Sequence, residues 1–162
     1  MIRNCARASA VAVAAAVVSA CGSNQSGVQR TPVASRVCAA LPSADVNAAA
    51  ALGVGPGVAT PDGQGCMYAN ASDGAAVTVL VDAGGASRYG SLRSTQGAFD
   101  VSGVGDRAFA VASGGGIVTV DIYAVRLSDV LVVTISAPES VADVEPATRD
   151  AEKVARVALQ KV

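Results

Sequence analysis

The segment "IVTVDIYAVRLSDVLVVTISAP", residues 117–138, decides the fold class, because it contains the clearest β-hairpin in the chain. Side-chain types alternate over 117–127, and β-branched residues dominate 130–137, as expected for two half-buried strands. Ser128 and Asp129 supply the turn between them, and Pro138 ends the second strand. Two strands joined by so short a turn must run antiparallel, so we expect an antiparallel sheet.

Three further strands are expected on the N-terminal side of this hairpin. Residues 66–71 and 75–83 are separated by Asp73-Gly74, a dipeptide typical of hairpin turns. Residues 107–112 form another short strand, and the three glycines at 114–116 turn the chain into the long hairpin. The sequence therefore predicts about five strands.

Three helices are expected around this sheet. Ser43 is a suitable N-cap for a helix over 44–52, and a second helix is predicted over 85–96. The C-terminal segment 145–162 carries an apolar stripe at helical spacing. We expect an α+β fold with a mainly antiparallel sheet of about five strands and flanking helices, in the order α-β-β-α-β-β-β-α.

The first 20 residues, "MIRNCARASAVAVAAAVVSA", are typical of a secretory signal peptide. Arg3 and Arg7 make the start positive, and residues 8–20 carry no charge. A transmembrane helix needs about 20 mostly apolar residues, and this run is shorter. Cys5 lies within the signal and leaves with it.

The end of the signal, Val18-Ser19-Ala20-Cys21, resembles the lipobox of bacterial lipoproteins. The resemblance implies cleavage between Ala20 and Cys21 and attachment of a diacylglyceryl group, with fatty acyl chains such as palmitate, to the Cys21 thiol. Residues 21–36 are then a lipidated, flexible tether, and 37–162 form one extracytoplasmic domain. A plain signal peptide cut near Ala20 is the alternative.

Cys38 and Cys66 are the two remaining cysteines of the mature chain. An exported protein meets an oxidising compartment, so we predict a Cys38–Cys66 disulfide. The core is built mostly from Ala and Val, with two Phe, three Tyr and no Trp, and it benefits from such a crosslink. Two free buried thiols, or pairing of Cys21 with one of them, are the alternatives.

The composition excludes several kinds of catalytic, metal and binding site. The chain has no histidine, which excludes Ser-His-Asp and Cys-His nucleophilic systems and histidine zinc sites. The net charge is −1 and no basic cluster is present, so we expect no nucleic-acid partner. We predict no catalytic residues, no metal ligands and no cofactor.

Three further patterns in the sequence are candidates for a functional site. Residues 103–108 match G-x-G-x-x-A, but a strand is expected after the motif, where nucleotide binding needs a helix; we interpret it as a turn. Asp121 and Asp129 are a candidate carboxylate pair, with ordinary surface acids as the alternative. Tyr68, Tyr89 and Tyr123 are either pocket residues or half-buried sheet residues.

The chain also resembles a family of actinobacterial, mycobacterial-type secreted lipoproteins that carry a domain of unknown function. The matching features are Cys38 followed by "ALPSADVNAAAALG", the "GC-x-Y" around Cys66 and Tyr68, and "VSGVGDRAFA" at 101–110. The resemblance implies a two-cysteine α+β domain held on the extracytoplasmic face of the cell membrane. It supplies no catalytic residues.

These observations lead to a hypothesis of function. We expect a lipid-anchored, non-catalytic binding or accessory module of the cell envelope, whose partner is an envelope lipid, a glycan or a membrane protein. The alternative is a carboxylate-dependent envelope hydrolase using Asp121 and Asp129. A purely structural or antigenic surface protein is a third reading.

Overall fold

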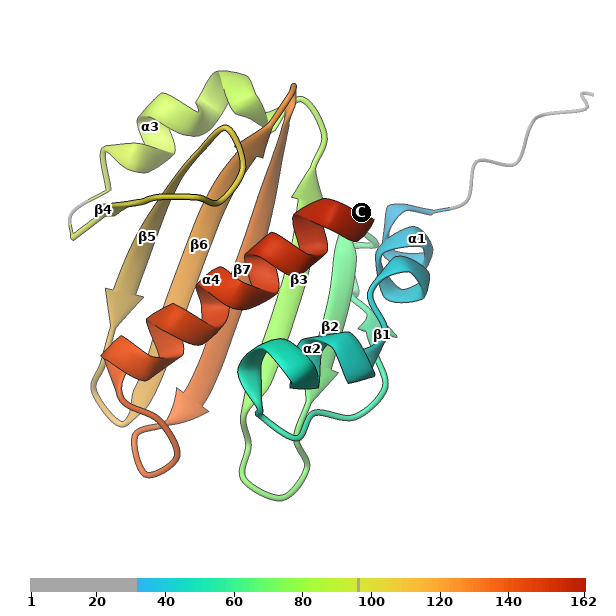
Figure 1. Ribbon diagram of the computed structural model, residues 1–162, viewed down its shortest axis with the longest axis vertical. Helices are drawn as coiled ribbons and strands as arrows, with labels where there is room; N and C mark the ends of the chain where they lie inside the picture. Colours follow the sequence, from blue (N-terminus) through green and yellow to red (C-terminus); the bar gives the residue numbers. More distant parts are fainter. Residues whose placement is uncertain (1–31, 96) are drawn as a thin grey trace, which may run out of the picture.

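Seven strands form one antiparallel sheet in the computed structural model, which describes residues 32–95 and 97–162 (Figure 1). The strands are β1 (Val58–Ala59), β2 (Gly65–Ala69), β3 (Ala76–Asp82), β4 (Phe99–Val101), β5 (Arg107–Ser113), β6 (Ile117–Arg126) and β7 (Asp129–Pro138). Their order across the sheet is β1-β2-β3-β7-β6-β5-β4. Two antiparallel runs, β1 to β3 and β4 to β7, thus meet along β3 and β7.

The long hairpin of β6 and β7 lies inside the sheet, with its ladder running from Ile117 opposite Pro138 to Arg126 opposite Asp129. Its tip includes Leu127, a non-glycine residue with a φ of 57°. The backbone N–H of Leu127 donates to a carboxylate oxygen of Asp106 at 3.0 Å. The turn before β5 therefore supports the hairpin tip.

The expectation of five strands, and with it the predicted element order, is wrong. The two additional strands, β1 and β4, have two and three residues and form the two edges of the sheet. Strands this short cannot display an alternating pattern. They are extended because β2 and β5 offer hydrogen-bonding partners, which the local sequence does not reveal.

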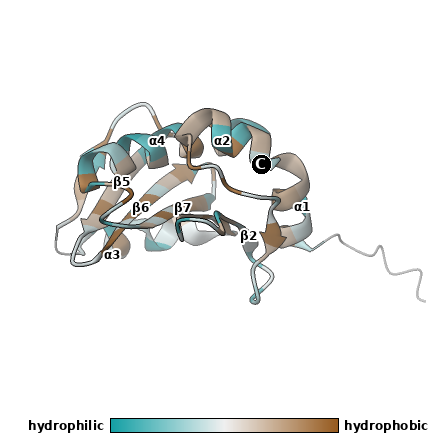
Figure 2. Cartoon of the chain, turned by 90° about the horizontal axis from the view of Figure 1, so that it is seen from below, coloured by the Kyte–Doolittle hydropathy of each residue, from teal (hydrophilic) through white to brown (hydrophobic). Residues whose placement is uncertain are grey.

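Helices cover both faces of the sheet (Figure 2). Helices α1 (Val33–Ala40), α2 (Ser43–Ala50) and α4 (Val144–Lys161) lie on one face. The 3₁₀ helix η1 (Gly85–Arg88) and α3 (Tyr89–Arg93) lie on the other, within the predicted helix 85–96. None of the helices in the described ranges is long and apolar enough to cross a membrane.

Helix α1 begins at Val33, inside the segment 21–36 that the sequence predicts as a tether. No side chain caps its N-terminus, which follows Pro32, so the usual start signal is missing. The helix forms because Val37 is fully buried against the sheet and Cys38 is bonded to β2. Tertiary contacts, rather than local propensity, determine this helix.

The main core lies between α4 and the sheet and is made of small side chains. Ala147, Ala151, Val154, Ala155 and Ala158 of α4 pack in one cluster with Val118, Val120, Ile122 and Ala124 of β6. A second, smaller core on the other face contains Tyr89, Phe109, Val125 and Val130. Only part of this second face is covered, because η1 and α3 together span nine residues.

The predicted disulfide between Cys38 and Cys66 is confirmed, with a Cα–Cα distance of 5.2 Å. It joins α1 to β2. Tyr68 lies two residues after Cys66 on the same face of β2. Its hydroxyl donates a hydrogen bond of 2.5 Å to the carbonyl of Leu41. A Cβ at Gly57 would lie 2.4 Å from the Cys66 sulfur and 2.6 Å from the Tyr68 ring, so the chain needs glycine there.

Candidate functional site

A groove of about 400 Å³ opens on the face of the sheet that carries α3. It lies between the η1–α3 segment on one side and strands β3 and β7 below, with the turn before β2 at its far wall. Its apolar lining is Leu80, Val81, Leu92, Val130 and Val132, and its polar lining is Asp62, Gln64, Asp82, Arg88, Ser91 and Tyr123. Its volume falls within the usual range for small-ligand sites, about 300–1,000 Å³.

The tip of the β6–β7 hairpin positions the helical wall of the groove. The N–H of Gly84 donates to the Asp129 carboxylate at 2.9 Å, and the N–H of Ala86 donates to the Ser128 carbonyl at 3.1 Å. Gly85 packs directly against Asp82, where a Cβ would come within 2.4 Å of a carboxylate oxygen. The helical segment therefore starts close to the end of β3.

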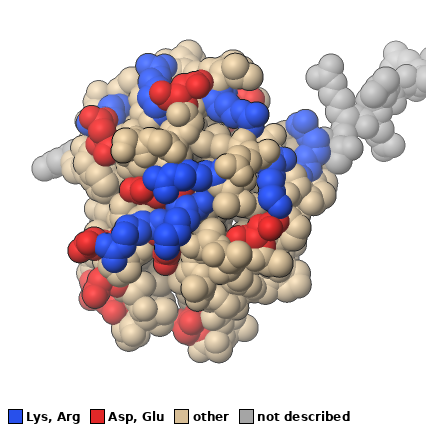
Figure 3. Space-filling view, in the orientation of Figure 1, with Lys and Arg blue, Asp and Glu red and all other residues tan. Residues whose placement is uncertain are grey.

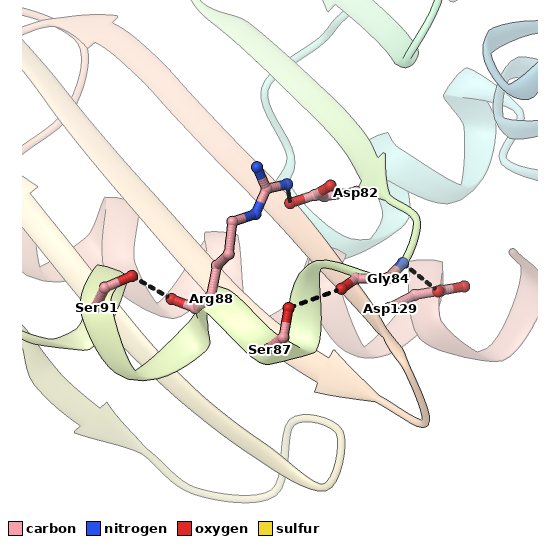
Figure 4. Close-up of polar contacts among 6 residues, drawn as sticks. All are labelled: Asp82, Gly84, Ser87, Arg88, Ser91 and Asp129. Carbon is pink, nitrogen blue, oxygen red and sulfur yellow. Dashed lines mark hydrogen bonds and ion pairs between the residues drawn. The ribbon is translucent and has the colours of Figure 1, made fainter.

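An ion pair between Arg88 and Asp82 spans the groove at this end (Figure 4). The guanidinium of Arg88 reaches back from η1 to the Asp82 carboxylate on β3, at 2.5 Å. The two side chains are 66% and 34% exposed, so both remain accessible to a ligand. The Ser91 hydroxyl donates to the Arg88 carbonyl at 2.8 Å and stiffens the turn that carries the arginine.

The opposite wall carries a second carboxylate, Asp62. Its oxygen accepts hydrogen bonds from the Thr60 hydroxyl at 2.6 Å and from the Gln64 N–H at 3.0 Å. The Thr60 bond first, and then the Gln64 bond, lower the pKa of Asp62 below its usual value. Asp62 is therefore ionised at neutral pH, and the groove lining carries two carboxylates and one guanidinium.

Tyr123 is the aromatic residue of the groove. Its ring stacks on Phe109, with ring centres 4.7 Å apart and planes 12° apart. Burial, and to a lesser extent the Asp121 charge, raise the pKa of Tyr123. Its hydroxyl has no hydrogen-bond partner within the described ranges, and so it is free to bond a ligand.

The candidate carboxylate pair does not converge. Asp121 pairs with Thr134 in the ladder and accepts a 2.6 Å hydrogen bond from its hydroxyl, whereas Asp129 pairs with Arg126. Positions 121 and 126 are five residues apart on β6, about 17 Å, and point to opposite faces. Glycoside hydrolysis needs carboxyl groups about 5–9.5 Å apart, so this pair cannot perform it.

The three tyrosines have different roles, and only Tyr123 lines the groove. Tyr68 is buried on the other face of the sheet, where desolvation, with a contribution from the Asp45 charge, raises its pKa to about 12. Tyr89 packs edge-on against Phe109 at 5.1 Å, with the Arg107 guanidinium over its ring. Tyr68 and Tyr89 thus serve the two cores.

The glycine motif at 103–108 is a turn between β4 and β5, as expected. Gly103 and Gly105 have φ values of 70° and 62°, and the strand β5 follows directly. The carbonyl of Gly103 accepts a hydrogen bond from Arg156 of α4 at 3.1 Å. The motif therefore connects the sheet edge to α4.

The surface over α4 carries both signs of charge (Figure 3). Three ion pairs lie along the helix: Arg149 with Glu145, Lys153 with Asp150, and Arg156 with Glu152. Acidic and basic side chains are therefore interspersed along the exposed face of α4. Among residues 32–95 and 97–162, no group of three potential metal ligands is found.

The predicted signal peptide and the lipidation residue Cys21, with the cleavage site at Ala20, lie outside the described residues. A scan of the chain against models of known protein families found no match, and a search of curated proteins found none either.

Sequence reasoning did not find the groove residues, apart from Tyr123. Asp82 ends an alternating strand and Arg88 follows six residues later, a spacing with no motif value. They meet only because the chain reverses at Gly84 and Gly85. The one local signal is that pair of glycines after a strand, which predicts a tight reversal but no site.

Proposed function

We propose that this chain is a lipid-anchored, extracytoplasmic lipoprotein whose domain is a non-catalytic binding module of the cell envelope. The observation that carries the binding function is the groove beside α3, where accessible polar side chains surround an apolar floor. This combination of apolar surface and a few placed polar groups is typical of ligand sites.

Export and anchoring are supported by a different set of residues. The Cys38–Cys66 disulfide is of the kind that persists in oxidising compartments. Upstream, the Val18-Ser19-Ala20-Cys21 sequence closes an uncharged run, as a lipobox does. Two acyl chains on Cys21 would give stable anchoring, because one chain alone binds membranes only marginally.

Cell fractionation tests the anchoring. The wild-type chain is expressed in a bacterium that processes lipoproteins, and compared with Cys21→Ala. We expect wild type in the membrane fraction and the variant outside it or unprocessed. Cys5→Ala is the matched control. Cys5 lies within the predicted signal peptide, so its replacement should leave the localisation of the protein unchanged. A Cys21→Ala variant that has lost its signal peptide and is still retained in the membrane fraction as fully as wild type would contradict lipid anchoring through Cys21.

A further inference from the structure

We infer that the groove binds a neutral oligosaccharide. This inference rests on the binding function proposed above, and narrows it to one class of ligand. It follows from the charge of the groove, from the arrangement of its polar rim, and from the apolar floor.

The charge of the groove disfavours anionic ligands. Its lining contains two carboxylates, Asp62 and Asp82, and one cation, Arg88, which is already paired with Asp82. A phosphate or carboxylate group would have to compete with Asp82 for the guanidinium while facing Asp62. Like-charge juxtaposition of this kind suppresses binding.

The polar rim disfavours an acyl chain. Filling the groove with hydrocarbon would remove water from the Asp82–Arg88 pair and from the Tyr123 hydroxyl without replacing their hydrogen bonds. Burying polar groups in this way costs free energy for each group left unsatisfied. The apolar part of the lining is also small for an acyl chain, because it consists of five side chains: Leu80, Val81, Leu92, Val130 and Val132.

A neutral sugar can contact both the polar and the apolar residues of the lining. Its hydroxyls both donate and accept, so they can bond the Asp82 carboxylate, the remaining N–H groups of Arg88 and the Tyr123 hydroxyl together. Its C–H faces pack on Leu80 and Val132. The Arg88–Asp82 pair is held from two elements, and such prepositioned planar groups lower the ordering cost of binding.

The experiment uses the mature lipidated protein in phosphatidylcholine nanodiscs, with methyl NMR of Leu80 and Val132 as the local readout. The probes are neutral hexasaccharides of glucose, mannose, galactose and arabinose, and hexose 6-phosphates as the anionic arm. A third arm replaces phosphatidylcholine by phosphatidylglycerol to detect lipid in the groove. We expect saturable shifts with at least one neutral hexasaccharide, and weaker or no shifts in the other arms.

Substitutions assign the binding to the groove. Arg88→Gln and Asp82→Asn should each weaken binding about 10–100-fold, because each removes hydrogen bonds to a charged group. Arg149→Gln is the matched control: Arg149 is also an exposed, ion-paired arginine, bonded to Glu145, but it lies on α4 on the other face of the sheet and does not line the groove. It should leave binding within about twofold, inside the scatter of a surface substitution.

Each other outcome overturns the inference in a recognisable way. Tighter binding of the hexose phosphates, or shifts caused only by the change of lipid, would show a binding groove with a different ligand class. No shift in any arm would overturn both the sugar and the binding function, while leaving the anchoring to the fractionation test. Sugar binding that Arg88→Gln and Arg149→Gln weaken equally would place the ligand elsewhere.

Discussion

The Tyr68 hydroxyl donates a hydrogen bond to the Leu41 carbonyl, and this bond ties β2 to the turn between α1 and α2. Cys66, two residues earlier on β2, makes the disulfide to Cys38 of α1. The "GC-x-Y" sequence thus places one covalent and one polar link on the same face of a strand. Together they attach α1 and α2 to a sheet whose core offers few large side chains.

Tyr68→Phe should lower the free energy of unfolding by about 1–2 kcal/mol, because it leaves the buried Leu41 carbonyl without its donor. Urea denaturation measures this directly. Tyr123→Phe is the matched control, because the Tyr123 hydroxyl has no protein partner in the described ranges. Its stability should change by less than about 0.5 kcal/mol. Equal effects of the two substitutions would contradict the role given to the Tyr68 bond.

The raised pKa of Tyr68 predicts a loss of stability in alkali. Above pH 10 the unfolded chain releases the Tyr68 proton, while the folded chain keeps it until about pH 12. The folded state then binds more protons, so stability falls as pH rises through this window, by roughly 2–3 kcal/mol in total. Tyr68→Phe should remove this part of the decline, measured by urea denaturation between pH 9 and pH 12.

Loss of the disulfide should destabilise the domain more than loss of the hydrogen bond. The crosslink closes a loop with a sequence separation of 28 residues, and the chain-entropy model gives about 3–4 kcal/mol for such a loop. The double variant Cys38→Ser and Cys66→Ser, measured in urea, should show this decrease. Dithiothreitol should reproduce it in wild type and have no effect on the variant.

Gly105→Ala and Gly103→Ala should separate backbone strain from steric overlap. Both glycines have positive φ, so alanine costs about 1–2 kcal/mol at either position. At Gly105 the new Cβ would also lie 2.5 Å from the Val125 carbonyl oxygen, whereas at Gly103 nothing lies within 4 Å. The Gly105 variant should therefore lose about 1–3 kcal/mol more. A similar loss for both would contradict the packing described here.

The central part of the fold could be predicted from the sequence because β6, β7 and α4 show strong periodicity. Their observed bounds, Ile117–Arg126, Asp129–Pro138 and Val144–Lys161, lie within two residues of those predicted. Helix α1 and the edge strand β1 could not be predicted. Their residues carry no start signal or alternation, and they form because β2 provides the disulfide partner and the hydrogen bonds.

The candidate site was harder to predict, for the same physical reason. Asp121 and Asp129 are close in sequence, but the register of the hairpin separates them onto opposite faces. Asp82 and Arg88 form an ion pair that depends on a chain reversal and on the position of the hairpin tip. Two charged residues without a characteristic spacing form no recognisable sequence pattern, so their pairing becomes apparent only in the folded structure.

Intact mass analysis of the protein isolated from the membranes of its native host tests the central claim most directly. We predict a mature chain that begins at Cys21, carries the added mass of a diacylglyceryl group, and is two hydrogens lighter for the Cys38–Cys66 bond. A chain that retains Met1, or one that begins near residue 21 without fatty acyl mass, would contradict the account.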